Sequence, residues 1–234
     1  MKIELCVASL DAVRFANELP VDRIETCIAL EQGGLTPSKA MVEWIQDTFN
    51  LEQHVLIRLR AGGFVYNYDE LLIMRNQLIA LKNTGIKGFV VGALTENYEL
   101  NIEILKIWKS TAPDLDFTFH RAFDSIVNWQ EAMDQLINIG FKRILTSGSD
   151  QNVLHGMRRL KEYVAYANGR IEIMAGGGVR EEVIPEICAT GVDAVHFSGT
   201  NPIKVELDTA FEETLLLPDL TKMNSLIAAV KSAN

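Results

Sequence analysis

Two patterns of hydrophobic and polar positions alternate along the chain. Short apolar runs rich in β-branched residues predict strands, and longer stretches with apolar residues three or four positions apart predict helices. The predicted strands cover residues 3–7, 23–27, 54–59, 88–91, 116–120, 143–146, 171–175 and 194–197. The predicted helices cover residues 10–19, 38–49, 68–84, 100–110, 127–139, 152–167, 181–189 and 221–233.

This alternation of strands and helices predicts a TIM barrel. Eight repeats without a linker-like break favour parallel strands joined by helical crossovers. Eight such units in 234 residues match a single (β/α)₈ domain over residues 1–234, near the short end of the usual length. An open, doubly wound sheet is the alternative architecture. The stretch 199–219 before the last helix is predicted to be loop-rich, and it could be partly mobile or dock against another subunit.

Polar side chains recur on one face of the predicted strands. Successive residues of a strand point to opposite faces, and the apolar face must meet the helices. The other face therefore points into the barrel, and in "KIELC" and "RIETC" it carries a carboxylate and a thiol in the same phase. The inward set comprises Glu4, Cys6, Glu25, Cys27, Arg58, Arg60, His120, Glu172, His196 and Ser198, with Arg121 and Asp124 just past one strand.

So many ionisable groups inside a barrel indicate a functional site. A buried charge without a partner is very costly, so these groups must pair, and nothing about the stability of the fold demands them. Most of them lie near the C-terminal ends of their strands, where barrel enzymes place their active sites. The alternative is a structural network of charges that fills the lumen, and for any single residue this alternative is equally good.

Glycine-rich loops follow the seventh and eighth predicted strands, in "MAGGGVREE" and "HFSGTNP". Glycines expose backbone N–H groups, and in many barrels the loops at these two positions bind phosphate. Glycines also occur where a turn is simply tight, so this alternative stays open. The predicted anion site comprises Ser147, Gly176, Gly177, Gly178, Ser198 and Gly199.

The inward groups permit acid–base catalysis on a small polar substrate. Two carboxylates that share a pocket separate their pKa values, which provides one acid and one base. Carboxylates and histidines could instead hold a divalent metal, but Arg58 and Arg60 would compete for the carboxylates. The candidate catalytic residues are Glu4, Glu25, Arg58, His120, Arg121 and His196.

The thiols permit a third kind of chemistry. Cys6 and Cys27 occupy equivalent positions of two strands, and neighbouring strands lie about 4.8 Å apart, so their sulfurs can lie close together. Two thiolates suit Cu(I), which prefers soft ligands. Free cysteines are also common as small buried residues, and this simpler interpretation stays open. It is the expected one for Cys188, which lies in a predicted helix.

Composition and charge limit the partners. The chain is 48% hydrophobic and 23% charged, as in ordinary globular proteins, and its net charge of −9 does not favour nucleic acid. No apolar run reaches the roughly 20 residues of a membrane span, and the N-terminus has no secretory signal pattern. Three cysteines do not make a disulfide framework. We therefore expect a cytoplasmic protein with reduced thiols.

Four motifs, "IETCIALEQGGLTPS", "FTFHRAFD", "RILTSG" and "IMAGGGV", together resemble the copper homeostasis protein family CutC. The resemblance covers nearly the whole chain and departs at Leu59 and Phe64, where the family usually has proline and an acidic residue. It implies a (β/α)₈ barrel, a cytoplasmic location and a homo-oligomer, either a dimer or a tetramer. It also implies a role in copper tolerance or trafficking, with Cu(I) bound by Cys6 and Cys27. An enzyme that acts on a small phosphorylated or carboxylated metabolite is the alternative, because two cysteine ligands do not require the inward Glu, Arg and His residues.

Overall fold

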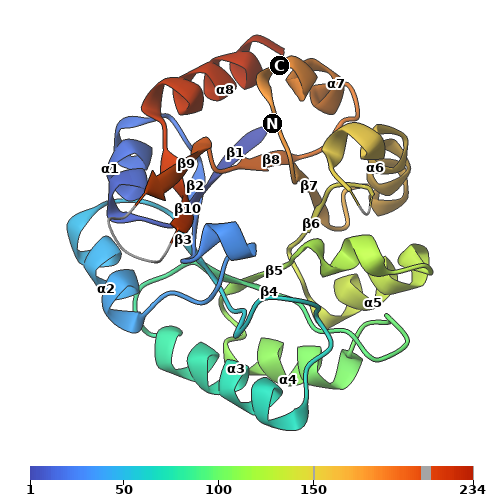
Figure 1. Ribbon diagram of the computed structural model, residues 1–234. Helices are drawn as coiled ribbons and strands as arrows, with labels where there is room; N and C mark the ends of the chain where they lie inside the picture. Colours follow the sequence, from blue (N-terminus) through green and yellow to red (C-terminus); the bar gives the residue numbers. More distant parts are fainter. Residues whose placement is uncertain (150, 207–211, 234) are drawn as a thin grey trace.

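Eight parallel strands hydrogen-bond in chain order, and the last pairs with the first, so the sheet closes into a barrel (Figure 1). The computed structural model describes residues 1–149, 151–206 and 212–233. The predicted (β/α)₈ TIM barrel with a single domain is confirmed. Its strands are β1 (Lys2–Val7), β2 (Arg23–Thr26), β3 (Gln53–Leu56), β4 (Gly88–Val91), β5 (Asp116–Phe119), β6 (Arg143–Thr146), β7 (Glu172–Gly176) and β8 (Ala194–Phe197).

Helices surround this barrel, and polar side chains start several of them. Ser38 and Asn101 each accept a hydrogen bond from the N–H three residues further on. Asn67 and Glu70 cap α3 reciprocally, because each side chain accepts from the backbone N–H of the other. None of the described helices is both long and apolar enough to cross a membrane. The helices are α1 (Leu10–Glu18), α2 (Lys39–Thr48), α3 (Tyr68–Leu81), α4 (Ile102–Thr111), α5 (Trp129–Ile139), α6 (Val153–Ala167), α7 (Ile184–Cys188) and α8 (Leu220–Ala233).

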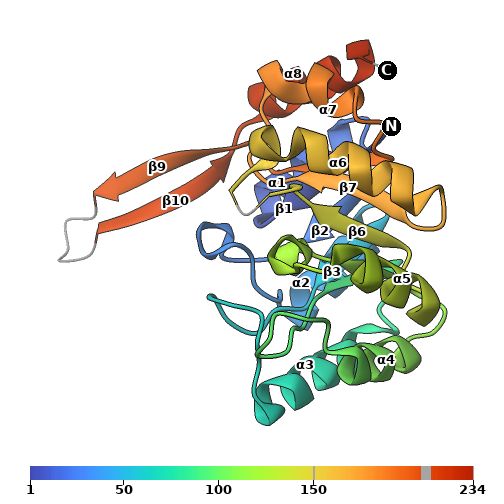
Figure 2. The same ribbon diagram turned by 90° about the vertical axis from the view of Figure 1, so that its right-hand side faces the viewer.

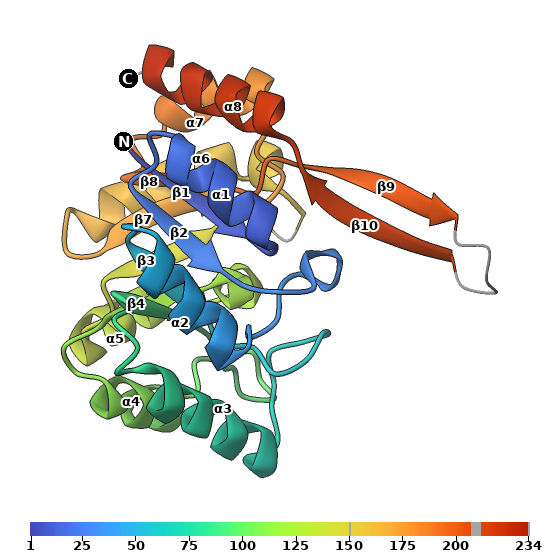
Figure 3. The same cartoon turned by 90° about the vertical axis from the view of Figure 1, so that its left-hand side faces the viewer.

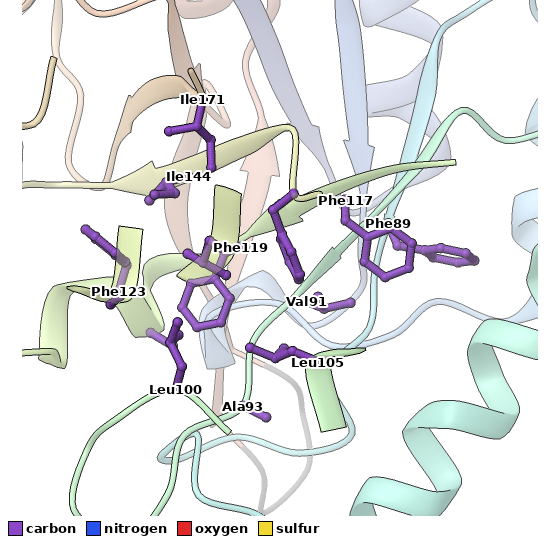
Figure 4. Close-up of a cluster of buried hydrophobic side chains, with 14 of the residues drawn as sticks. Phe89, Val91, Ala93, Leu100, Leu105, Phe117, Phe119, Phe123, Ile144 and Ile171 are labelled. Atoms are coloured by element: carbon purple, nitrogen blue, oxygen red, sulfur yellow. The ribbon is translucent and has the colours of Figure 1, made fainter. Parts of the chain in front are cut away.

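The hydrophobic core lies between the strands and the helices, as the phase of the strands predicts. Phe89 of β4 and Phe117 of β5 are fully buried, and their rings meet edge to face with centroids 5.8 Å apart. Leu105 of α4 and Phe123 belong to the same cluster (Figure 4). The apolar face of the sheet is therefore covered, and the polar face is left to line the lumen.

The segment after β8 differs from the predicted loop. Two antiparallel strands, β9 (Thr200–Glu206) and β10 (Glu212–Pro218), form a ribbon that projects from the barrel (Figures 2 and 3). We call this ribbon the β9–β10 arm. The prolines at positions 202 and 218 both lie within this two-stranded ribbon, where prolines are tolerated. Residues 207–211 of the predicted loop lie outside the described part of the chain.

Three residues of the predicted inward set, Glu4, Arg60 and Glu172, do not line the mouth of the barrel. Strand β3 ends at Leu56, so the alternation of faces stops before Arg60. The side chain of Arg60 is 40% exposed and pairs with Glu70 of α3. Glu172 begins β7 and pairs with Arg143 at the N-terminal end of the barrel, where their Nε and Oε2 atoms are 3.0 Å apart.

Candidate functional site

A cavity of about 270 Å³ opens at the C-terminal ends of the strands. Most of the sequence-predicted site residues line it, although they come from loops and strands far apart in the chain. Glu4, Ser147 and Gly176 do not belong to its wall. The predicted residues that line the cavity are Cys6, Glu25, Cys27, Arg58, His120, Arg121, Gly177, Gly178, His196, Ser198 and Gly199.

Glu4 lies one layer deeper and contacts Arg23 and His196. Its carboxylate pairs with Arg23 of β2 and accepts a hydrogen bond of 2.7 Å from Nδ1 of His196. Burial alone would raise the pKa of Glu4, but the hydrogen bond from His196 and the charge of Arg23 hold it well below its usual range. Glu4 is therefore a permanently charged anchor for His196, and it has no proton to give at neutral pH.

Glu25 is the carboxyl group that faces the cavity. Its Oε2 atom is buried and has no hydrogen-bond partner, and it lies 3.9 Å from Nδ1 of His196. Burial, opposed by His196 and reinforced by the negative charge of Glu4, raises the pKa of Glu25 to about 7. Two carboxyl groups in the same phase of neighbouring strands thus hold different protonation states, as the acid–base hypothesis predicts for a shared pocket.

Cys6 and Cys27 lie side by side at the edge of this group. Their Sγ atoms are 3.6 Å apart, both thiols are free, and the Sγ of Cys6 is 4.0 Å from Oε1 of Glu25. The hydrogen bond to Cys27, burial and the nearby carboxylates raise the pKa of Cys6. One donor atom each from Cys6, Glu25 and His196 lie within 4.8 Å of one another. This cluster has the donor types and the spacing of a metal site.

Arg58, Phe64 and His120 form a further part of the cavity wall. The guanidinium of Arg58 lies 5.4 Å from the centroid of the Phe64 ring, which in turn lies 4.6 Å from the centroid of the His120 ring. The Nδ1 atom of His120 accepts a hydrogen bond of 3.1 Å from the N–H of Ala122. Burial and the charge of Arg58 lower the pKa of His120 to about 3. His120 is therefore neutral at pH 7 and carries its proton on Nε2.

The glycine loop after β7 is shaped around an arginine. Gly177 has φ +93°, and a Cβ atom there would come within 2.8 Å of Cζ of Arg121. Arg121 pairs with Asp124 at 2.9 Å and donates to Oγ of Ser147 at 3.0 Å. Ser147 thus acts behind the wall as a support for Arg121. The predicted helix after this loop is reduced to a 3₁₀ turn and the five residues of α7.

The family comparison agrees with the sequence motifs. The model of the CutC family matches residues 1–201. The chain belongs to the CutC family. A CutC family protein from Glaesserella parasuis is 40% identical over 199 residues, which are 85% of this chain and 82% of that protein. The human copper homeostasis protein cutC homolog is 32% identical over 243 residues, which cover 98% of this chain and 89% of the human protein.

Solved structures agree with this assignment. The crystal structure of a CutC protein from Streptococcus agalactiae has a TM-score of 0.79 and 34% identity, and it covers 84% of this chain and 97% of that chain. A thiamine phosphate pyrophosphorylase from Pyrococcus furiosus has a TM-score of 0.62 at 13% identity, covering 99% of this chain and 96% of that chain. At that identity the second likeness concerns the barrel fold alone.

Sequence reasoning missed the deeper polar layer of this CutC family barrel. Arg23 is 1% exposed and donates to Glu4 and to Sδ of Met174. The Nη1 atom of Arg143 lies 3.3 Å from Nδ1 of His54, and Arg143 is also buried. Arg23 has the phase of Glu25, and His54 has the phase of Arg58. Applying the alternation of faces to the first residue of each predicted strand predicts that Arg23 and His54 also point into the barrel.

Proposed function

We propose that this CutC family protein takes part in copper homeostasis in the cytoplasm and binds Cu(I) through Cys6 and Cys27. The observation that carries the proposal is the pair of free thiols, 3.6 Å apart, on the wall of the mouth cavity. Soft sulfur ligands select Cu(I) over the harder divalent ions. The copper homeostasis name of the human relative supports the same cargo.

The surroundings of the two thiols are compatible with reversible binding of a metal ion. Thiols bind copper as thiolates, so the raised pKa of Cys6 means that protons must leave when Cu(I) enters. Leu56 and Val90 pack against the two cysteines and keep that part of the cavity apolar. Competition by protons therefore makes the affinity fall as the pH falls.

A Cu(I) titration against a chromophoric chelator under anaerobic conditions tests this proposal. We expect one tightly bound Cu(I) per chain, and loss of that site in the double variant Cys6→Ser/Cys27→Ser. The matched control is Cys188→Ser, because Cys188 is a free cysteine on α7 outside the cavity wall. Unchanged stoichiometry and affinity in the double variant would remove the proposal.

The assembly state belongs to the same proposal. Homo-oligomers are expected from the family resemblance, and the exposed Ile203 and Leu217 on the β9–β10 arm offer apolar surface for such a contact. Sedimentation equilibrium of the full chain measures the mass directly. A monomer at micromolar concentration would contradict this part.

A second candidate function is favoured by unpaired polar atoms. Oε2 of Glu25, Nε of Arg58 and Nε2 of His120 are all buried without a hydrogen-bond partner, and all three residues line the cavity. Buried polar groups nearly always have partners, so a polar ligand is expected there. We propose as the alternative an enzyme that acts on a small anionic metabolite, with the glycine loops and Ser198 as part of the anion site.

A thermal-shift screen of phosphorylated and carboxylated metabolites tests the second candidate. A ligand of the native state must raise the melting temperature, and Arg58→Ala must abolish that rise. The hits then enter a turnover assay by mass spectrometry. Absence of any turned-over compound would count against catalysis.

A further inference from the structure

Arg58 is a buried cation that lacks a counter-ion. The residue is 6% exposed, and no carboxylate pairs with it among the described side chains, which are those of residues 1–149, 151–204 and 214–233. The other arginine of the cavity wall, Arg121, pairs with Asp124, and Arg60 two positions along pairs with Glu70. A buried charge is stable only when it is compensated, so the partner of Arg58 is expected from outside the chain.

Three backbone carbonyls hold the guanidinium of Arg58 in one place, and its Nε–H makes no hydrogen bond. Nη1 donates to the carbonyl oxygens of Gln32 and Gly34, and Nη2 donates to that of Gly62, each at 2.9 Å. These carbonyls are neutral, so they orient the group without compensating its charge. The Nε–H is buried and has no partner within hydrogen-bond geometry. The phenol of Tyr66 also lies against Arg58, but burial raises its pKa, so it is neutral and does not compensate the charge. An arginine fixed in this way is preorganised to receive an anion.

His120 contributes a second fixed donor to the same wall. A Cβ atom at Gly92 would come within 2.3 Å of Cε1 of His120, so the ring fills the space that this glycine leaves. The bond from Ala122 occupies Nδ1, and the buried Nε2 has no partner. Phe64 packs against both Arg58 and His120, and the charge of Arg58 acts on His120, so the two side chains are neighbours in this wall.

We infer that Arg58 and His120 form a carboxylate-binding subsite that holds one end of a small organic acid in the mouth cavity. This inference rests on the second candidate function, and it specifies the chemical class and the position of the anion. One cationic donor and one neutral donor match a monoanion with two acceptor oxygens. A phosphate dianion would carry twice the charge of the single unpaired cation. The cavity of about 270 Å³ limits the acid to a small molecule.

The rest of the cavity is compatible with the remainder of such a molecule. The loops with Gly177, Gly178 and Ser198 line the cavity as well, together with Lys222 of α8. The Nζ of Lys222 is already engaged by the carbonyl oxygen of Thr200 at 2.7 Å. Arg121 has a carboxylate partner in Asp124. Lys222, like Arg58, is held by neutral oxygens, but it is only half-buried. Arg58, 6% exposed, is therefore the buried cation of this wall that requires a counter-ion from the ligand.

The inference is tested by titrating metal-free protein, labelled with ¹⁵N-histidine, with acetate, pyruvate, malate and 2-oxoglutarate, and with inorganic phosphate and the neutral amide pyruvamide. We expect at least one carboxylate to bind and to shift the Nε2 resonance of His120, and pyruvamide not to bind. Because charge-assisted hydrogen bonds are strong, Arg58→Lys and His120→Phe should each weaken that carboxylate by about tenfold or more. Arg60→Gln is the matched control, since its guanidinium lies outside the cavity and should leave the affinity unchanged.

The possible outcomes separate this inference from the second candidate function. Circular dichroism of each variant shows that it is folded, and His120→Phe keeps the ring volume if Arg58→Lys proves unstable. Binding of no carboxylate by the wild type, or equal affinity in both variants, would overturn the inference. Phosphorylated compounds that are turned over equally by wild type and Arg58→Lys would support catalysis and refute the carboxylate subsite. Arg58-dependent binding without turnover would support the subsite and refute catalysis.

Discussion

His120 links the stability of the barrel to pH. Burial and the neighbouring Arg58 lower the pKa of His120 from 6.5 to about 3, so between these values the unfolded chain takes up a proton that the folded protein refuses. The resulting stability is fully present above pH 6.5 and is lost as the pH falls toward 3. Each pH unit below 6.5 removes about 1.4 kcal/mol, so His120 alone lowers the free energy of unfolding by about 2 kcal/mol between pH 7.5 and pH 5.

The variant His120→Phe isolates this contribution because it keeps a ring and removes the titrating group. We expect urea unfolding at pH 7.5, 6 and 5 to show that the wild type loses about 2 kcal/mol more than the variant over this range. The other groups with shifted pKa values, such as Glu4 and Glu25, are common to both proteins, so they cancel in the difference.

A buried residue that does not titrate provides the control. Thr118 is fully buried and accepts a hydrogen bond from Arg143. Thr118→Val should therefore lower the free energy of unfolding at every pH, while the dependence of this free energy on pH stays as in the wild type. If His120→Phe runs parallel to the wild type from pH 7.5 to pH 5, His120 is not held neutral by its surroundings. The assignment of its proton to Nε2 would then be wrong too.

Three further substitutions test the packing and the polar layer. Glu4→Gln removes the partner of Arg23 and should cost roughly 3–5 kcal/mol in urea unfolding, and a loss below 1 kcal/mol would contradict the buried ion pair. Asn67→Ala should cost about 1 kcal/mol by breaking the capping box of α3, whereas Asn67→Asp should retain it. Gly156→Ala would place a Cβ atom 1.8 Å from the carbonyl oxygen of Ser147, so we expect a loss of about 1–3 kcal/mol, and wild-type stability would refute this close contact.

The sequence pattern predicted secondary structure best where burial of apolar side chains determines the element. The strands β1 and β8 are apolar on the face that meets the helices, so the alternation of side chains identified them directly. The stretch that forms the β9–β10 arm was predicted to be loop-rich. Its strands depend on each other's hydrogen bonds, which no window of sequence contains.

The candidate site shows the same division. Glu25, His120 and His196 were predicted from their phase and line the cavity, whereas Arg60 was predicted inward and lies outside because β3 ends early. Side chains alternate between the two faces of a strand, so the sequence position predicts the face of a residue only as far as the strand extends.

The sequence by itself determined the barrel class and which residues face the lumen, because both follow from the periodicity of apolar side chains. Only the tertiary structure determined at which level along the barrel axis these residues lie, and therefore which of them are neighbours. Glu4 and Glu25 hold equivalent positions in two strands, yet the register pairs Glu4 with Arg23 and His196, and Glu25 with Cys6. This stagger between neighbouring strands of a closed barrel gives Glu4 the partners Arg23 and His196 and leaves Glu25 facing the cavity.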